Sequence, residues 1–540
     1  MPEPISFSPP FARHFAPHCA EWLRHARTAA SVIAMGLLAG CVSYRGIDPK
    51  AQPAEASSLA ASQSLGQAAV ANGQWPAAEW WKRLGDAQLD QLVSEALAGS
   101  PNIRAAIARE DSALAAATIV GAQQGLGVTA GYDLTRQLLS RYGLVPQGFG
   151  GKWFTTNQLA LNFQYQVDVW GRNQAALEAS LGQVKAVEAE VQAARLSLST
   201  AVVQAYIELA RNFEQADIAR AMLKQREGLL SLAHERLNAG LDSQIDVRQV
   251  EVSLPEARAR ILQYEQAVEM GRNQLAALLG QGPDRGKRIG RPQFAVSAMD
   301  TPLPSSLPAD LLGRRPDIVA ARWRIEATRR DIQSAKAAFY PNINLAGIVG
   351  LQSLVLSKFL STQAEFMSFG PAVRLPLFGS GTLQGTLAAR DADYDAAVER
   401  YNQLLADALR EVVDQVDALR FTDQQGAELD RAMALAEDSY RLAQARESGG
   451  LSGRLPVLSA EGQLLMRKST LVDLRGMRLA LNIGLVRALG GGYEPGSEQS
   501  PARSPSASET PAIATRAASA SPAAGATPAA GAAPAAGAAR

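Results

Sequence analysis

The pattern of hydrophobic and polar positions predicts a β-strand across residues 159–169. Every odd position of this segment is apolar or aromatic: Leu159, Leu161, Phe163, Tyr165, Val167 and Val169. The even positions between them are Ala160, Asn162, Gln164, Gln166 and Asp168. A period of two places the two sets on opposite faces of a strand. The run has about the 9–11 residues that a tilted strand needs to cross a bilayer. We therefore predict a membrane strand, with a half-buried soluble strand as the alternative.

The predicted faces assign an environment to each side chain of this strand. The residues expected to face lipid are Leu161, Phe163, Tyr165 and Val167. The polar even positions would line a water-filled interior, as in membrane barrels. Trp170 follows the strand at the level where an aromatic girdle is expected.

The same strand pattern occurs again later in the chain. The matching residues lie at a constant offset in the sequence. The pairs are Leu159 with Met367, Leu161 with Phe369, Tyr165 with Val373, Val167 with Leu375, Val169 with Leu377, and Trp170-Gly171 with Phe378-Gly379. Two further alternating segments, 126–134 and 343–351, each precede one of these strands. Polar segments at about 137–156 and 353–364 are expected to link them. The chain is therefore predicted to contain two copies of one unit, with two strands in each.

Long helical patterns follow each pair of strands. Apolar residues recur every seven positions in both copies, at Leu177, Val184, Val191, Leu198 and Ala205 and at Val398, Leu405, Val412 and Leu419. A helix of about 60 residues would be roughly 90 Å long. Sustained heptads predict coiled-coil packing. Each long helix ends at a glycine turn, Gly240 or Gly450, and a returning helix follows, so each copy is predicted to form a helical hairpin.

The ends of the chain differ from this repeated body. A basic region and an apolar region end in Leu38-Ala39-Gly40-Cys41, which resembles a bacterial lipobox and implies cleavage before Cys41 and lipid attachment to it. The predicted domain plan is a signal segment at 1–40, a lipid-anchored tether at 41–76, an N-terminal helix region at 77–99, repeat 1 at 100–299, repeat 2 at 300–492 and a disordered Ala/Pro-rich tail at 493–540.

Composition narrows the classes of function. The 540 residues carry 53 basic and 52 acidic side chains, a net charge of +1, which argues against nucleic acid as a partner. The chain has 2 Cys and 4 His, and the processed chain would keep only Cys41 and His234 of these. That leaves no set of residues for a His/Cys metal site or a Ser-His-Asp triad. We therefore expect no enzyme activity, no metal and no cofactor. A secreted enzyme that uses paired carboxylates remains the alternative.

The number of strands predicts an oligomer. Four strands per chain cannot close a membrane barrel, which has at least about eight, and open edges do not remain in lipid. Eight strands leave an interior that side chains just fill. A trimer with twelve strands is the smallest assembly whose sheet closes into a barrel and still leaves a water-filled interior.

Several motifs together resemble one family, the TolC-like outer-membrane factors of tripartite efflux pumps, in their NodT-type lipoprotein branch. They are Glu79-Trp80-Trp81 with Asp86 and Leu89, Arg314-Arg315-Pro316-Asp317-Ile318, Tyr340-Pro341 before a strand, Val169-Trp170-Gly171 before the long helix, the paired glycine turns and the lipobox. The resemblance spans about Ala77 to Gly492. It implies a mainly α-helical fold with a membrane β-barrel part: a homotrimer with a twelve-stranded outer-membrane barrel, continued by long coiled-coil hairpins that form a periplasmic α-barrel.

The resemblance also implies a function and partners. The chain would passively conduct small molecules, such as drugs or toxic compounds, from the periplasm to the exterior. It would be lipid-anchored in the outer membrane and would contact a periplasmic adaptor and an inner-membrane pump of the RND type. Type I protein secretion, which uses the same architecture, is one alternative. A lipid-anchored periplasmic coiled-coil adaptor that conducts nothing is another.

The family's periplasmic aperture lies at the helix turns, often lined by aspartates. Matched turn to turn, those aspartates fall at Pro456 and Ser459, so the second copy departs from the acidic pattern. The remaining candidates for the helical tip are Asp242, Asp246 and Arg454. The alternative is that these three are ordinary polar turn residues.

Overall fold

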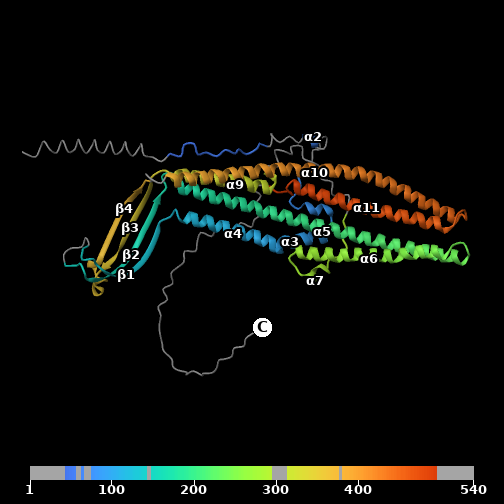
Figure 1. The fold of residues 1–540 in the computed structure, drawn as a ribbon, viewed down its shortest axis with the longest axis horizontal. Coiled ribbons are helices and arrows are strands. Elements are labelled where there is room, and N and C mark those ends of the chain that lie inside the picture. Colours follow the sequence, from blue (N-terminus) through green and yellow to red (C-terminus); the bar gives the residue numbers. More distant parts are fainter. Residues whose placement is uncertain are drawn as a thin grey trace, which may run out of the picture. The chain divides into compact units, whose positions relative to one another are not determined.

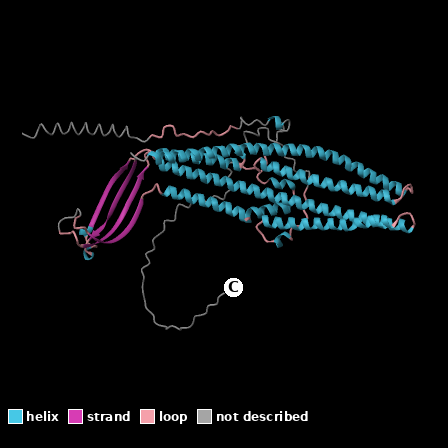
Figure 2. Ribbon diagram, in the orientation of Figure 1, coloured by secondary structure: helices cyan, strands magenta, loops and turns pink. Residues whose placement is uncertain are grey.

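The computed structural model describes six ranges of the chain, residues 43–55, 62–65, 75–142, 148–294, 313–375 and 380–494. All of them belong to one unit, Met1–Pro495. The predicted signal segment at 1–40, the predicted lipid site Cys41 and the tail from residue 495 lie outside the described residues, as do Leu377 and Phe378-Gly379. Helices predominate in the described part, and its strands form one sheet (Figure 1, Figure 2).

Helices and strands follow one another in the same order in both halves of the chain. The first half contains α2 (Ser62–Leu65), η3 (Trp80–Leu84), α3 (Ala87–Gly99), α4 (Pro101–Ala122), β1 (Gly127–Leu138), β2 (Trp153–Val167), α5 (Arg172–Asn238), α6 (Gln244–Leu278) and α7 (Pro283–Gly286). The second half contains α9 (Pro316–Ala337), β3 (Asn342–Ser353), η5 (Leu356–Lys358), η6 (Thr362–Ala364), β4 (Glu365–Arg374), α10 (Ser380–Ser448) and α11 (Arg454–Ala488). The unit that repeats is a helix, a β-hairpin and a long helical hairpin.

Some predicted strand ends were wrong. The first link was expected at 137–156, but β1 runs to Leu138 and β2 begins at Trp153. Polar residues interrupt the alternation there, yet Thr155 still pairs with Arg136 because ladder hydrogen bonds use the backbone and do not require apolar side chains. The second link, expected at 353–364, contains two short 3₁₀ turns, η5 and η6.

The four strands form an antiparallel sheet in the order β1-β2-β3-β4. β1 and β2 form a hairpin, as do β3 and β4, whereas β2 and β3 become neighbours only after the chain has passed through the helices between them. Within the described chain, β1 and β4 are therefore the edge strands.

The long helices pack along one another. α5 contacts α4, α6, α9 and α11, and α10 contacts α9 and α11. Most of the predicted heptad positions are buried, among them Val184, Val191 and Leu198 in α5 and Val398, Leu405 and Val412 in α10, whereas Leu177 is half-buried. Residues seven positions apart lie on the same side of a helix in a coiled coil, so their shared burial agrees with coiled-coil packing.

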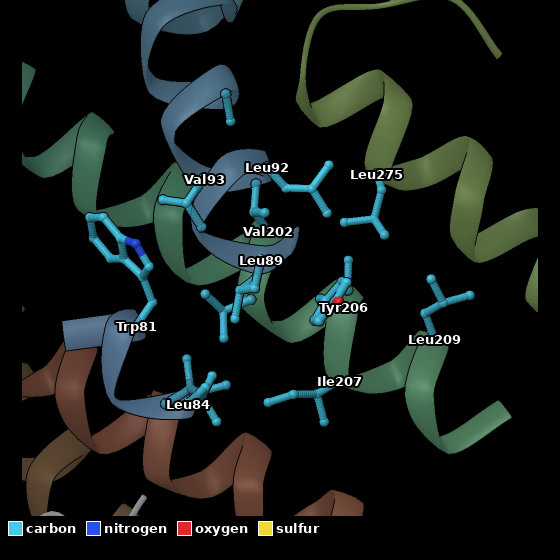
Figure 3. Close-up of a cluster of buried hydrophobic side chains, with 14 of the residues drawn as sticks. Trp81, Leu84, Leu89, Leu92, Val93, Val202, Tyr206, Ile207, Leu209 and Leu275 are labelled. Carbon is cyan, nitrogen blue, oxygen red and sulfur yellow. The ribbon is translucent and has the colours of Figure 1, made fainter. Parts of the chain in front are cut away.

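The largest hydrophobic cluster joins the N-terminal helix region to the middle of α5. The cluster buries side chains of η3 and α3 against α5 and α6 (Figure 3). Its members include Trp80, Trp81 and Leu84 of η3, Leu89, Leu92 and Val93 of α3, Val202, Tyr206 and Leu209 of α5, and Leu275 of α6. Leu89, Leu92 and Val93 recur at helical spacing, so α3 presents them on one face.

A buried carboxylate fixes the position of this cluster. Asp86 caps α3 by accepting hydrogen bonds from the backbone N–H groups of Gln88 (2.9 Å) and Leu89 (3.3 Å). Its second oxygen accepts from the Tyr206 hydroxyl (2.7 Å) and from the Gln293 N–H (2.8 Å). Burial, together with the hydrogen bond to Asp86, raises the pKa of Tyr206, so the phenol stays protonated and keeps donating.

Arg315 makes a comparable junction in the second half. Its buried guanidinium donates to Asp317 (2.6 Å), to Glu411 of α10 (2.9 Å) and to the carbonyl oxygen of Ala488 at the end of α11 (3.2 Å). A charge-assisted fork of this kind ties three helices at one point.

The segment 43–55, predicted as part of an extended tether, lies against α9 and α10. The backbone N–H groups of Lys50 and Ala51 donate to Asp395 (2.9 Å each), and the N–H of Ala54 donates to Asn402 (2.7 Å). Lys336 pairs with Asp48 (2.9 Å). This part of the tether therefore follows the helices through specific contacts.

We predict that Asp86→Ala lowers the free energy of unfolding by about 2–4 kcal/mol, because it removes a helix cap and leaves the Tyr206 hydroxyl and the Gln293 N–H without this acceptor. Urea unfolding of the detergent-solubilised protein, followed by tryptophan fluorescence, measures the change. Glu79→Ala is the control, since Glu79 pairs with Lys82 in an exposed ion pair, and its expected loss is under about 0.5 kcal/mol. Equal stability of the two variants would contradict the proposed junction.

Candidate functional site: the two faces of the sheet and the two helical tips

The register of the sheet assembles one apolar face from all four strands. Phe163 of β2 lies between Val128 of β1 and Gly347 of β3, and Gly347 in turn pairs with Phe369 of β4. The face consists of Val128, Ala130, Tyr132 and Leu134, of Leu159, Leu161, Phe163, Tyr165 and Val167, of Ile343, Leu345, Val349 and Leu351, and of Met367, Phe369, Pro371 and Val373, with Gly347 among them. The charged Glu365 pairs with Leu351 at the end of this face that is distant from the helices. All four predicted lipid-facing residues are on it.

The opposite face is mostly polar or small. Asn162 lies between Thr129 of β1 and Ile348 of β3, and Ile348 pairs with Ser368 of β4. Gln164 lies between Gly127 and Ala346. The sheet therefore separates an apolar surface from a hydrophilic one over its full width.

Much of the apolar face is exposed in the single chain. Its large exposed side chains are Val128, Tyr132, Leu134, Leu159, Leu161, Tyr165, Leu345, Met367, Phe369 and Val373. A contiguous exposed patch of this size marks contact with lipid or with another apolar surface.

Aromatic residues connect the sheet to the helices. The ring of Trp170, after β2, stacks on that of Tyr340, before β3, with 4.7 Å between centroids. The Trp170 indole N–H donates to the carbonyl oxygen of Pro341 (2.9 Å). Asp168 accepts from the backbone N–H of Gln174 in the first turn of α5 (2.8 Å). The segment after β2 in the first repeat is thus joined to the segment before β3 in the second repeat.

The two helical hairpins end in turns with the same backbone geometry. Gly240 and Gly450 both have φ of 74°, in the left-handed region that glycine favours. In both turns the leucine after the glycine, Leu241 or Leu451, donates its N–H to the arginine carbonyl five residues earlier (2.8 Å each). Both turns lie at the same end of the helices (Figure 1), where Gln225 of α5 donates to the carbonyl oxygen of Leu458 in α11 (2.7 Å).

The predicted acidic tip residues are engaged within the first turn. Asp242 accepts two hydrogen bonds from Arg236 (2.8 Å each), which lowers the pKa of its carboxyl group. Asp246 accepts from the hydroxyl (2.7 Å) and the backbone N–H (2.8 Å) of Ser243 at the start of α6, and these bonds lower the pKa of Asp246. Both carboxylates therefore shape their own turn.

The second turn presents different chemistry on the same backbone. Gly453 precedes α11 and provides no side-chain cap. Arg454, Pro456 and Ser459 are all exposed. The residue in the place of Asp246 is Pro456, within the first turn of the helix, where its missing N–H is not required.

Four exposed apolar residues at the tips were not singled out from the sequence. Leu241, Ile245, Leu451 and Leu455 are 68%, 69%, 76% and 47% exposed. They occupy matching positions in the two copies. The signal that could have identified them is the leucine that follows the cap glycine in each turn, because an apolar residue at this place normally packs against its own helix.

None of the described helices combines the length and the apolar character needed to cross a lipid bilayer.

Comparison with known proteins connects these surfaces to one family. The outer membrane efflux protein family model matches residues 92–281 and 307–491. The fusaric acid resistance protein FusA of Burkholderia cepacia is 38% identical over 370 residues, which cover 67% of this chain and 69% of FusA. The multidrug resistance outer membrane protein MdtP of Escherichia coli (strain K12) is 30% identical over 440 residues, covering 79% of this chain and 89% of MdtP.

A solved structure has the same architecture. The outer membrane protein VceC of Vibrio cholerae matches with a TM-score of 0.71 and 36% identity, over 78% of this chain and 100% of that one. This confirms the predicted fold class, a mainly helical TolC-like channel subunit with a helical barrel part and a membrane β-barrel part, and the predicted outer-membrane location with extension into the periplasm. Family and fold are those of channels rather than enzymes. The chain belongs to the outer membrane efflux protein family and is an outer-membrane channel for efflux.

Proposed function

We propose that three copies of this chain close a twelve-stranded barrel by pairing β1 of each copy with β4 of the next. The observation that carries this proposal is the four-stranded sheet, which has two edge strands and one continuous apolar face. Unpaired backbone groups cost several kcal/mol each in lipid, so both edges require partners there. Two copies would leave an interior filled by side chains, whereas three leave a passage.

The polar face of the sheet lines this passage, and Leu161, Phe163, Tyr165 and Val167 contact lipid. Asn162, Gln164 and Gln166 alternate with them along β2 and present hydrogen-bonding groups to water in the lumen. Conduction is passive, because the chain offers a wet path and makes or breaks no bond. Lipid attached to Cys41 adds an anchor at the periplasmic side of the outer membrane.

The helical tips contact a periplasmic adaptor, which links the channel to an inner-membrane pump that supplies the energy. Leu241, Ile245, Leu451 and Leu455 are exposed at the two turns and supply the apolar surface for this contact. Asp242 and Asp246 hold the first turn in shape, and Arg454 gives the second turn a positive charge. Tip contacts of this kind have the mixed apolar and polar character of protein interfaces.

The transported compounds are small organic molecules, including drugs and toxic compounds. Relatives named for multidrug resistance and for fusaric acid resistance support this class over secreted proteins. The pump, rather than the polar face of the sheet, selects the compound.

Phe163→Arg is predicted to prevent assembly in the membrane. An arginine on the lipid face near the bilayer midplane costs about 2–4 kcal/mol per chain. Heat-modifiable gel migration of outer-membrane fractions reports the oligomer. Asn162→Arg is the matched control, since it adds the same charge one position away on the polar face, and it is expected to assemble. A normal oligomer from Phe163→Arg would refute the assignment of the faces.

Leu451→Asp is predicted to abolish efflux while the oligomer persists, because it places a charge in the apolar tip. Susceptibility of cells to a panel of toxic compounds, in a strain that lacks its own channel, measures efflux. Leu451→Met keeps an apolar side chain at the same position and should restore resistance to the wild-type level. Full resistance with Leu451→Asp would show that the adaptor does not use this surface.

A further inference from the structure

The connection between β3 and β4 is an ordered apolar loop. Residues 354–364, which we call the β3–β4 loop, contain the two 3₁₀ turns η5 and η6. The hydroxyl of Ser353 donates to the carbonyl oxygen of Val355 (2.9 Å). The hydroxyl of Ser361 donates to the carbonyl oxygen of Lys358 (2.7 Å). The backbone N–H of Lys358 also donates to the carbonyl oxygen of Val355 (3.0 Å). These bonds give the loop a defined shape.

One side of the loop is fixed to the apolar face of the sheet. Phe359 is 7% exposed, and its ring lies 6.0 Å from that of Tyr132 on β1. Asn157 is the polar residue at the distal end of the apolar row of β2, and it is only 1% exposed. It accepts a hydrogen bond from the Tyr132 hydroxyl (3.2 Å) and donates to the carbonyl oxygen of Ser353 (3.5 Å). The side chain of Asn157, which interrupts the apolar face, is therefore buried next to the start of the loop.

The other side of the loop is apolar and exposed. Leu354, Val355, Leu356 and Leu360 are 53%, 51%, 68% and 83% exposed. The exposed Lys358 lies among them. Large apolar side chains in an ordered loop would be unfavourable in water, at about 25 cal/mol for each Å² left exposed.

We propose that the β3–β4 loop is embedded in the outer leaflet of the outer membrane, with its four exposed apolar side chains among acyl chains and Lys358 at the level of the lipid phosphates. The loop continues the apolar face of the sheet through Phe359 and Tyr132. Counted from Val167, the 9–11 residues of a membrane crossing reach about Asn157, whose amide donates to the carbonyl oxygen of Ser353 directly before the loop. The loop therefore lies at the height where acyl chains give way to headgroups.

This inference rests on the proposed orientation of the apolar face toward lipid, and the test separates the two. Single cysteines at Leu356 and Leu360 are labelled with a nitroxide in the assembled full chain, reconstituted in vesicles of phospholipid and lipopolysaccharide. Leu161→Cys provides the lipid reference, and Tyr142→Cys, at a fully exposed residue (100%), provides the water reference. The wild-type chain, treated in the same way, measures any labelling of Cys41.

Accessibility to oxygen and to a water-soluble nickel chelate then locates each label. The expected result is that labels at Leu356 and Leu360 fall between the two references, with higher oxygen and lower nickel accessibility than the label at Tyr142. Nickel accessibility equal to that at Tyr142 would place the loop in water, and shielding from both reagents would place it against a neighbouring chain; either result overturns the inference. Nickel access at Leu161 itself would overturn the orientation of the face as well. Leu354→Cys provides a second site should one label disturb assembly.

Discussion

The need to satisfy backbone hydrogen bonds in lipid determines how the sheet of this chain can assemble in a membrane. Its sheet has four strands, and two of them, β1 and β4, have no neighbour on one side within the described chain. Water could satisfy these edges, but the exposed apolar face of the same sheet excludes an aqueous environment on that side. Only pairing with further copies resolves both demands. Pro371 carries no N–H, so β4 offers one ladder donor fewer.

The helices position this sheet through a small number of polar junctions. Trp170 and Tyr340 join the two β-hairpins at their helical ends. Asp86 and Arg315 each tie several segments at one buried point. Such junctions are directional, whereas the apolar heptad contacts of α5 and α10 would permit sliding by whole turns. The polar junctions therefore set the register that the apolar contacts leave open.

The sequence predicted those features that depend on periodicity. Alternation along β2 predicted the strand and its two faces, and the register of the neighbours places Leu161, Phe163, Tyr165 and Val167 on one of them. Heptads predicted the long helices because one residue in seven meets the same neighbour. Strand ends could not be predicted, since outside the apolar zone the ladder of β1 and β2 continues through Thr155 and Arg136 without any pattern in the side chains.

Features that depend on contacts between residues distant in sequence could not be predicted either. The position of Asp86 before α3 suggests a helix cap, but its bonds to Tyr206 and Gln293 require the folded chain. Likewise, the segment after β3 was predicted as a polar link although it contains several apolar residues, and its pattern gave no sign that Phe359 would turn back to Tyr132. Periodicity describes what an element faces, and it carries no information on which partner comes from elsewhere in the chain.

The two helical tips show how repetition of a backbone differs from repetition of a function. Both turns use a left-handed glycine and the same hydrogen bonds, so the repeats impose one geometry. Their charges differ, because the acids Asp242 and Asp246 of the first turn are replaced by Ser452 and Pro456 in the second. The pKa values of Asp242 and Asp246 are lowered by Arg236 and Ser243, respectively. A lowered pKa keeps a carboxylate ionised further into the acidic range, so acidification from neutrality to about pH 5 leaves both groups charged and both turns intact. Mild acid therefore leaves the hydrogen bonds that Asp242 and Asp246 accept within the first turn in place.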